Sequence, residues 1–362
     1  MRRNGTLIRV DIASSLDDSY FSKLTTTSAR RMAAKSSLWS SDDQAYWETY
    51  LSARPKYSSA FYDRIFAYHF DHAKDSPDVA VDVGTGPGQV AQVLATRFRH
   101  VIVNDPSENH LQAARARLVE MDSDGRASFV ACKGEDVHEH VEAESVDFVA
   151  AAECIPLMDP VAALEAFSRI LKPGGTMAVW FYGRPQFVAD DGSEEWDEAC
   201  NAAYGRVAGK AYGELGKKML ASPDPGVKRV AERARGVVES RLESVEVPES
   251  CWEDVRRTSW NGDCKEFAFF GVGPAVDGTK MASKVGKHEK VEEIRDRSFW
   301  AEQWGVEEAK RFIAVNVPSF DPKTLEKDEY LPLLQELKDA IGGRGATKQV
   351  TWPVVLIMAT KK

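Results

Sequence analysis

Short apolar runs alternate with amphipathic stretches through the middle of this chain. An apolar run at 79–83 ends at three alternate glycines, a helix-like stretch follows at 89–98, and a second apolar run covers 100–104. Strand-like runs separated by helical stretches are typical of a mostly parallel sheet with helices on both faces. The last apolar run, WPVVLIMAT at 352–360, is typical of another buried strand. The pattern predicts an α/β protein.

Two stretches outside this core have helical periodicity. Aromatic residues from Tyr46 to Tyr68 recur at spacings of three, four and seven around a break at Pro55. The stretch 184–250 has no place in a minimal nucleotide-binding sheet and predicts helices on both sides of the breaker SPDPG at 222–226. Five segments are expected: a mobile or partly ordered arm at 1–40, a helical cap at 41–76, a nucleoside-binding core at 77–183, a helical insertion acting as lid at 184–250, and strands and helices that complete the sheet at 251–362.

The glycine turn after the first strand is the strongest indication of chemistry. Gly84, Gly86 and Gly88 allow a tight turn that brings the backbone against a ligand, and Asp82 precedes them. Asp105 ends the second strand, about 20 residues further on, where an acidic side chain binds a ribose diol in nucleoside-binding α/β units. Asp105 can equally cap the helix that begins at Pro106.

The type of nucleoside follows from two departures from the dinucleotide fingerprint. Gln89 occupies the place of its third glycine. The anionic Asp82 would repel a pyrophosphate at this helix terminus, whereas it suits a ligand that carries an amine. S-adenosylmethionine has an ammonium, a sulfonium and no phosphate, so we expect it as the cofactor.

With these residues the chain resembles the class I S-adenosylmethionine-dependent methyltransferases. Five motifs occur in the family's order: VDVGTGPG at 81–88, VIVNDPSENHL at 101–111, FVACKGEDV at 129–137, SVDFVAAAE at 145–153 and RILKPGGTMAVWFYG at 169–183. The resemblance implies a Rossmann-like, doubly wound sheet of seven mostly parallel strands with the last strand antiparallel. It also implies that Asp105 and Pro106 lie at the ribose, Gly134 and Glu135 at the adenine, with Asp136 a neighbouring alternative to Glu135, and Ala151 beside the methionine part.

Within this family the chain is similar to trans-aconitate methyltransferase and its fungal small-molecule relatives. The segment 46–69, the run WFYGRP and the C-terminal strand carry this narrower likeness, and many relatives have a His-Trp-Phe run where this chain has Pro156, Leu157 and Met158. In that group the segment around Arg54 lies over the cofactor. Arg54 is therefore expected either to pair with the methionine carboxylate or to play a structural role beside Pro55.

The expected reaction is in-line displacement at the sulfonium methyl by a small-molecule acceptor, a carboxylate or a specialised metabolite, with orientation as the main source of catalysis. Glu153, His69 and Tyr182 are the catalytic candidates, although each could instead serve packing or capping. Tyr46, Trp180 and Arg184 are the candidate acceptor contacts. A carboxylate acceptor needs no general base, whereas a phenol must lose a proton.

The composition of the chain limits the kinds of partner that we expect it to bind. The chain carries 47 basic against 56 acidic residues, a net charge of −9, which disfavours nucleic acid. No apolar stretch is long enough for a membrane helix and the start lacks a secretory h-region, so a cytoplasmic protein is expected. The five cysteines show no metal-ligand spacing and are expected to be reduced thiols. Whether the chain forms a homodimer stays open.

Three rival functions remain. A methyltransferase-fold protein can bind the cofactor yet catalyse a cyclisation that leaves the substrate mass unchanged. A non-catalytic binding partner would not need Asp82, the three glycines or Asp105. A nicotinamide-dependent dehydrogenase is disfavoured by Gln89.

Overall fold

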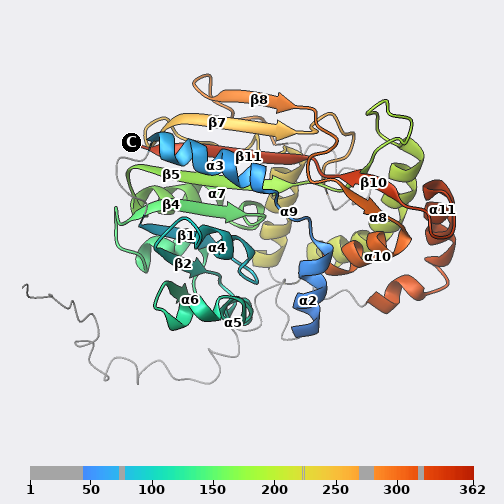
Figure 1. The fold of residues 1–362 in the computed structure, drawn as a ribbon, viewed down its shortest axis with the longest axis horizontal. Helices are drawn as coiled ribbons and strands as arrows, with labels where there is room; N and C mark the ends of the chain where they lie inside the picture. The colour runs from blue at the N-terminus through green and yellow to red at the C-terminus, as the bar shows by residue number, and fades with distance from the viewer. Residues whose placement is uncertain (1–43, 73–77, 222, 224, 269–280, 317–321) are drawn as a thin grey trace, which may run out of the picture. The chain divides into compact units, whose positions relative to one another are not determined.

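A central sheet of eight strands organises the computed structural model, which describes residues 44–72, 78–221, 223, 225–268, 281–316 and 322–362. Its strands are β1 (Val79–Val83), β2 (His100–Asn104), β3 (Ala127–Val130), β4 (Val146–Ala152), β5 (Leu171–Tyr182), β7 (Trp252–Trp260), β8 (Lys290–Ile294) and β11 (Val354–Lys361). Their order is β3-β2-β1-β4-β5-β11-β7-β8 (Figure 1). β1 to β5 pair in parallel, and β11 runs antiparallel to both β5 and β7. The predicted fold class and antiparallel last strand are confirmed.

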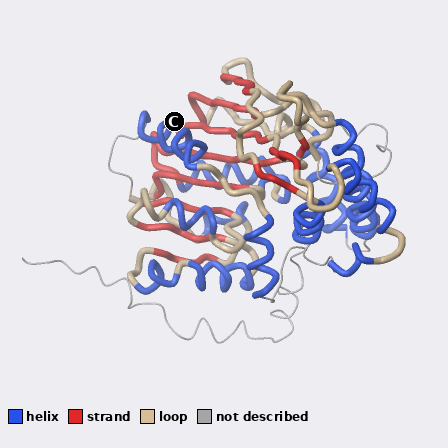
Figure 2. The backbone as a smooth tube through the Cα atoms, turned by 45° about the vertical axis from the view of Figure 1, so that its right-hand side comes forward, coloured by secondary structure: helices blue, strands red, loops and turns tan. Residues whose placement is uncertain are grey.

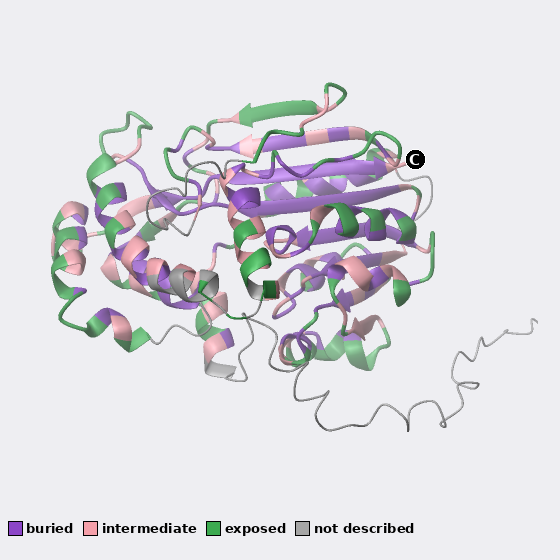
Figure 3. Ribbon diagram, turned by 180° about the vertical axis from the view of Figure 1, so that it is seen from behind, coloured by how far each residue is buried: buried purple, intermediate pink, exposed green. Residues whose placement is uncertain are grey.

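The sheet has one strand more than the seven expected. β8 pairs in parallel with β7 at the edge of the sheet, and four of its five residues are exposed (Figure 3). The sequence there, KVEEI, is mostly charged, so neither alternation nor an apolar run indicated a strand. After β8, the chain first becomes helical in α10 (Val306–Val315).

Helices cover both faces of the sheet. α3 (Ser59–His72) lies across β5 and β11, and α4 (Gln89–Leu94) packs on β1 and β2 (Figure 1). α7 (Pro160–Ile170) and α9 (Pro225–Glu239) lie behind the sheet in that view (Figure 3). The remaining helices of the core are α5 (Glu108–Arg117), α6 (Val119–Ser123) and the short 3-10 helices η2 (Gly134–Glu139) and η3 (Ile155–Leu157).

Local sequence explains where these helices begin. The Asp159 carboxylate accepts hydrogen bonds from the N–H groups of Val161 and Ala162, and Pro160 occupies the first helical position of α7. Ser58 Oγ accepts from the N–H of Phe61 at the start of α3. Phe61, Ile65 and Phe66 of α3 are buried against the sheet, and each such side chain contributes about 1.5 to 3 kcal/mol.

A second, smaller layer is built beside the carboxyl ends of the strands. It contains α2 (Gln44–Ala53), α8 (Glu198–Leu220), α10, η4 (Pro322–Glu326) and α11 (Leu331–Ile341), with a three-stranded antiparallel sheet in the order β6 (Gln186–Phe187), β10 (Lys348–Thr351), β9 (Glu302–Trp304). Figure 2 shows these helices grouped at one end of the large sheet. α8 contacts α9 and α11, and α10 contacts α2. The insertion therefore packs with the C-terminal helices, one of which, α10, also contacts the cap.

Several features bear on the sequence expectations. α8 and α9 form within the predicted insertion, on both sides of residues 222–226. The predicted arm at 1–40 lies outside the described residues. The described helices include none that is both long and apolar enough to cross a membrane. In the described residues, no group of three or more His, Cys, Asp and Glu side chains could hold a metal ion.

Candidate functional site

The glycine turn at the carboxyl end of β1 has a left-handed backbone at each of its three glycines. The φ angles are +65° at Gly84, +53° at Gly86 and +84° at Gly88, a region that side chains with a Cβ adopt only at a cost. The N–H of Thr85 donates to the carbonyl of Asn104 at 2.9 Å, which ties the turn to the end of β2. The turn is thus fixed between two parallel strands.

Asp82 and Asp105 hold this turn by accepting hydrogen bonds from it. Asp82 is buried, and its Oδ2 accepts hydrogen bonds from Thr85 Oγ1 (2.5 Å) and the N–H of Ala91 (2.9 Å). Asp105 accepts from the N–H of Gly86 at 3.0 Å. Desolvation by burial raises the pKa of Asp82 to about 7, and the nearby Asp105 adds to the rise, while the two hydrogen bonds to Asp82 oppose it.

A histidine that the sequence reasoning did not single out completes the surroundings of Asp105. His110 Nδ1 lies 3.0 Å from Asp105 Oδ1, and the His110 ring meets the ring of Trp47 edge to face at 4.9 Å. Trp47 belongs to α2, so the helical cap contacts the acidic group through His110. In the sequence, the only signal for His110 is its position in the first turn of α5, just after the expected ribose-binding acid.

The turn leaves open space at one glycine only. A Cβ on Gly84 would lie 2.7 Å from the Cβ of Cys154, and one on Gly88 would lie 3.3 Å from the Cα of Ala114. A Cβ on Gly86 would have no atom within 4 Å outside its chain neighbours. The free volume above Gly86, next to Asp105, is a place where a ligand can contact the backbone. A nucleoside fits this cradle because Asp105 can accept from a ribose hydroxyl.

The other expected cofactor residues surround this cradle. Gly134 begins η2, and Glu135 accepts the N–H of Asp159 through Oε1 at 2.9 Å. A Cβ on Gly134 would lie 2.7 Å from Cε of Met158, so this glycine is required by packing as well. Ala151 pairs with Val83 in the sheet and is buried, and Pro106 is exposed after Asp105. The structure brings these residues to the carboxyl ends of β1, β2 and β4.

A polar group lies beside the cradle, where β4 and β5 end. Arg54 Nη1 donates to the hydroxyl oxygen of Tyr182 at 2.5 Å, and Glu153 Oε1 accepts the N–H of Tyr182 at 2.6 Å. Glu153 has a φ of +60°, a strained value for a residue with a Cβ. Desolvation raises the pKa of Glu153 well above its ordinary value, while the N–H of Tyr182 and the charge of Arg54 oppose the rise.

Known proteins resemble this chain in sequence over most of its length. The family profile of the methyltransferase domain matches residues 81–179. Methyltransferase pgmE of Aspergillus terreus is 38% identical over 325 residues, which cover 88% of this chain and 94% of the relative. Methyltransferase cfoB of Aspergillus candidus is 37% identical over 330 residues, or 91% and 98% of the two chains. The chain belongs to the class I S-adenosylmethionine-dependent methyltransferases. Its cofactor is S-adenosylmethionine.

A solved structure supports the fold of this methyltransferase. A protein from Anaeromyxobacter dehalogenans, assigned as a type II methyltransferase, has a TM-score of 0.51, is 18% identical, and covers 85% of this chain and 97% of its own. The likeness therefore extends beyond the region that the family profile matches, to the cap and the C-terminal part.

The structure does not bring His69 to the site of this methyltransferase. His69 Nδ1 is 2.9 Å from Thr176 Oγ1, and Thr176 pairs with Phe148 near the amino end of β4. Its ring packs against Phe98 and Phe148, and burial lowers its pKa to about 4. The assignment of His69 as a catalytic residue is wrong, because α3 places it at the opposite end of the strands from the glycine turn.

Of the three expected acceptor contacts, two anchor the cap and the insertion. The hydroxyl of Tyr46 donates to the carbonyl of Val315 at 3.1 Å and so joins α2 to α10. Arg184 is buried, pairs with Glu266 and donates to the carbonyl of Asn201 at 3.0 Å. Trp180, in contrast, is at the site: its ring meets that of Tyr57 at 5.7 Å.

Sequence reasoning named Tyr182 as a catalytic candidate but did not single out Tyr57 and Trp300, which form an aromatic wall with it. The ring of Tyr57 lies 4.9 Å from that of Trp300 and 6.3 Å from that of Tyr182. Trp300 has a φ of +55° and follows β8, far along the chain from the motifs. Tyr57 was visible as a member of the aromatic periodicity but had no signal that separated it from core residues.

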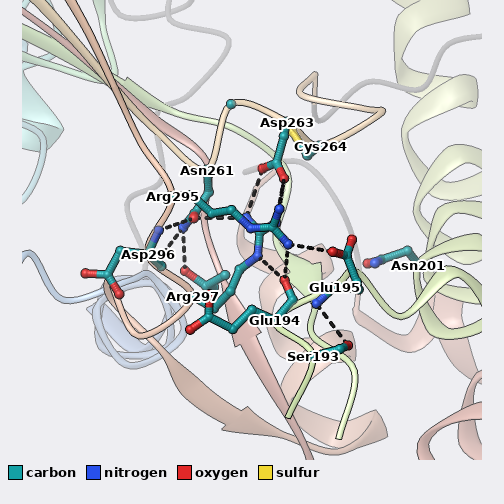
Figure 4. A network of polar contacts seen from close by, with 12 residues as sticks. Ser193, Glu194, Glu195, Asn201, Asn261, Asp263, Cys264, Arg295, Asp296 and Arg297 are labelled. Atoms are coloured by element: carbon teal, nitrogen blue, oxygen red, sulfur yellow. Dashed lines mark hydrogen bonds and ion pairs between the residues drawn. The ribbon is translucent and has the colours of Figure 1, made fainter. Parts of the chain in front are cut away.

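A buried arginine network holds the loop that carries Trp300 (Figure 4). Arg297 donates to both carboxylate oxygens of Asp263, at 2.9 and 2.6 Å, and to the carbonyl of Glu194 at 2.9 Å. Its guanidinium also lies 3.5 Å from the ring centroid of Trp196. The network joins the end of β8, the end of β7 and the start of the insertion, so Trp300 is positioned from three separate parts of the chain.

Proposed function

We propose that this enzyme transfers the methyl group of S-adenosylmethionine to an oxygen atom of a small-molecule acceptor, a specialised metabolite. The observation that carries the proposal is the position of the Arg54–Glu153–Tyr182 group directly beside the cofactor cradle. Cys154 links this group to the cradle: it follows Glu153 in the chain and packs next to Gly84. Its Sγ donates to the carbonyl of Val83 at 3.2 Å. The likeness to Aspergillus methyltransferases over most of the chain supports the metabolite class.

Seven residues in and around the glycine turn would hold the cofactor. Asp82 and the turn of Gly84, Gly86 and Gly88 would accommodate the methionine part and its ammonium, and Asp105 the ribose. Gly134 and Glu135 would lie against the adenine. The bound cofactor supplies an electrophilic methyl group on a sulfonium, so the protein has to align the acceptor oxygen and exclude water. Alignment of this kind is worth about 7 to 11 kcal/mol of the barrier.

Glu153 is the side chain best placed to take a proton from a hydroxyl acceptor. Desolvation makes its carboxylate a stronger base than an exposed glutamate. Tyr182 is not expected to accept a proton itself. Burial raises its pKa well above the ordinary value, so its hydroxyl stays protonated and can donate a hydrogen bond to the acceptor.

The test has two stages. Calorimetric titration with S-adenosylmethionine, S-adenosylhomocysteine and NAD is expected to give binding of the two adenosyl ligands only. Incubation with methyl-labelled cofactor and a panel of phenols, carboxylic acids and amines is then scored by mass. Products that gain one methyl group on oxygen support the proposal. Cofactor binding with a product of unchanged mass would instead indicate a cyclase-type reaction and refute it.

A matched pair of variants separates chemistry from structure at Glu153. Glu153→Gln keeps an oxygen that accepts the N–H of Tyr182, so the melting temperature is expected to stay unchanged while kcat with a phenol acceptor falls about 100-fold or more. Glu165→Gln, on the exposed face of α7, is the control. An unchanged kcat in Glu153→Gln would rule out the proton-accepting role.

A further inference from the structure

Three buried hydrogen-bond donors belong to side chains in or next to the aromatic wall and have no acceptor among the described residues. These donors are Arg54 Nε, Trp180 Nε1 and Trp300 Nε1. Tyr57 contacts the rings of both tryptophans, at 5.7 and 4.9 Å, and Tyr182 contacts both Arg54 and Trp300. A buried donor without a partner costs about 1 to 3 kcal/mol, so such a set favours a ligand rich in acceptor oxygens.

The position of Arg54 decides which ligand it faces. Its guanidinium carbon lies 4.7 Å from the ring centroid of Tyr50, 5.8 Å from that of Tyr182 and 5.9 Å from that of Phe312. Tyr182 ends β5 and Phe312 belongs to α10. The carboxyl group of Glu153, at the end of β4, also acts on Arg54. Arg54 therefore lies on the β5 side of the site, away from the glycine turn.

The surroundings of Arg54 suit a planar ring. Tyr50, Tyr57 and Tyr182 supply flat faces, and the planes of Tyr57 and Trp300 are only 30° apart. Tyr50, Arg54 and Tyr57 are each only partly buried although they lie among buried residues, so each has surface available to a ligand. Aromatic side chains bind aromatic guests by stacked or edge contacts, each worth about 0.5 to 1.5 kcal/mol beyond area burial.

The charge at this point favours an anion. Glu153 is the carboxyl group that opposes Arg54, and desolvation favours the protonated form of Glu153. Glu153 is protonated either when a carboxylate acceptor binds beside it or once it has taken the proton of a phenol. The guanidinium then has no full counter-charge, and a planar anion with two acceptor sites matches its fork.

We propose that Arg54 binds the ionised oxygen of an aromatic acceptor, a phenolate or an arene carboxylate, and thereby selects the acceptor, instead of holding the methionine carboxylate of the cofactor. This inference rests on the proposed function. The acceptor oxygen forms a bond to the methyl carbon while the carbon–sulfur bond breaks and its electron pair stays on sulfur as a thioether. A phenol acceptor first gives its proton to Glu153, whereas a carboxylate has none to lose. Methylation removes the charge that Arg54 binds, which favours release of the product.

The experiment compares Arg54→Met with Arg54→Lys and with the control Arg64→Met, an arginine of α3 that stacks over Trp260 and pairs with Glu292. Each protein is titrated with S-adenosylhomocysteine and then, in its presence, with 2-naphthoate, neutral 2-naphthamide and the chromogenic 4-nitrophenol. We expect wild type to bind 2-naphthoate about ten-fold more tightly than 2-naphthamide, which corresponds to about 1.4 kcal/mol. We also expect bound 4-nitrophenol to be ionised at a lower pH than the free probe.

In Arg54→Met the preference for 2-naphthoate and the shift of 4-nitrophenol should disappear, in Arg54→Lys they should weaken, and in Arg64→Met they should persist. The affinity for S-adenosylhomocysteine should change less than about three-fold, or ~0.7 kcal/mol. Loss of the 4-nitrophenol shift alone would indicate phenolates, and loss of the 2-naphthoate preference alone would indicate carboxylates.

Two results overturn the inference. If Arg54→Met weakens S-adenosylhomocysteine about ten-fold or more and leaves the probes unaffected, Arg54 holds the methionine carboxylate. If wild type and Arg54→Met bind each probe with the same affinity and shift the ionisation of 4-nitrophenol equally, Arg54 does not select the acceptor. Failure of the proposed function looks different, because wild type would then give no product that gains a methyl group on oxygen. The binding comparison of the variants does not depend on turnover, so it still decides the role of Arg54.

Discussion

Arg54 Nη1 donates to the hydroxyl of Tyr182 across a distance of 2.5 Å, although the two residues are 128 positions apart in the chain. This contact joins the helical cap to the end of β5 and places a cation beside the cradle formed by the glycine turn. It also fixes the position of the Tyr182 hydroxyl oxygen, which accepts a hydrogen bond from the guanidinium. The cap therefore contributes chemistry to the site as well as covering it.

Gly86→Ala is expected to abolish cofactor binding through space rather than through folding. Its left-handed φ of +53° costs an alanine about 1 to 2 kcal/mol, and the new methyl group occupies the open volume above the turn. Gly192→Ala is the matched control, because Gly192 has a φ of +74° and equally free surroundings but lies in the insertion. Both variants should lose similar thermal stability, and only Gly86→Ala should fail to bind S-adenosylmethionine in a calorimeter. Equal affinities in the two variants would contradict the cradle.

Binding of the cofactor is expected to release a proton from Asp82. Its folded pKa of about 7 means that the carboxyl is mostly protonated at pH 6, whereas the cofactor's ammonium favours the ionised form. Titration with S-adenosylhomocysteine in buffers of different ionisation enthalpy should show release of about one proton at pH 6 and almost none at pH 9. Asp82→Asn should show none at either pH, and the exposed-helix variant Asp122→Asn should behave as wild type.

The same shift sets the pH dependence of stability. For a carboxyl group whose pKa is raised in the folded state, the stabilising contribution is fully present below the unfolded value and is lost as the pH rises through the folded value. The free energy of unfolding of the cofactor-free protein should therefore decline between about pH 4 and pH 7, and Asp82→Asn should reduce this decline. A variant profile parallel to that of wild type would be incompatible with the burial of Asp82.

Asp105→Asn is expected to weaken cofactor binding without unfolding the chain. The amide retains an oxygen that can accept the N–H of Gly86, but it loses the charge-assisted bonds to a ribose diol, each worth about 1.5 to 3 kcal/mol. The dissociation constant for S-adenosylmethionine should rise at least ten-fold, and the melting temperature should stay close to that of wild type. If affinity is unchanged, the ribose lies elsewhere.

Arg297→Met should destabilise the fold by about 3 kcal/mol, since it leaves Asp263 and the carbonyl of Glu194 without their buried partner. The neighbouring Arg295 is 45% exposed and makes surface pairs, so Arg295→Met should cost about 1 kcal/mol or less. Chemical denaturation measures both. Because the network positions Trp300, the acceptor KM should rise in Arg297→Met even below its unfolding transition. If the two variants are equally stable, the network contributes no more to stability than a surface ion pair does.

The sequence by itself determined the cofactor half of this protein. Its motifs are local: Asp82 and the glycines are neighbours in the chain, and Asp105 ends the next strand, so strand pairing alone had to bring them together. The parallel core and the antiparallel last strand followed from apolar runs and from the family resemblance. β8 gave no such signal, because its exposed, charged residues are held by backbone pairing with β7 and by ion pairs such as Lys290–Asp254, neither of which depends on an apolar pattern.

The residues proposed to bind the acceptor come together only in the folded structure. These residues come from four separate parts of the chain: Arg54 from the cap, Glu153 from the end of β4, Tyr182 from β5 and Trp300 from the loop after β8. No spacing in the chain encodes their contacts. The same reason explains why His69 was misplaced: its residue type suited catalysis, but the direction of α3 across the sheet buries it at the amino ends of the strands. Local sequence fixes a turn, whereas a site assembled from distant segments depends on how the whole core packs.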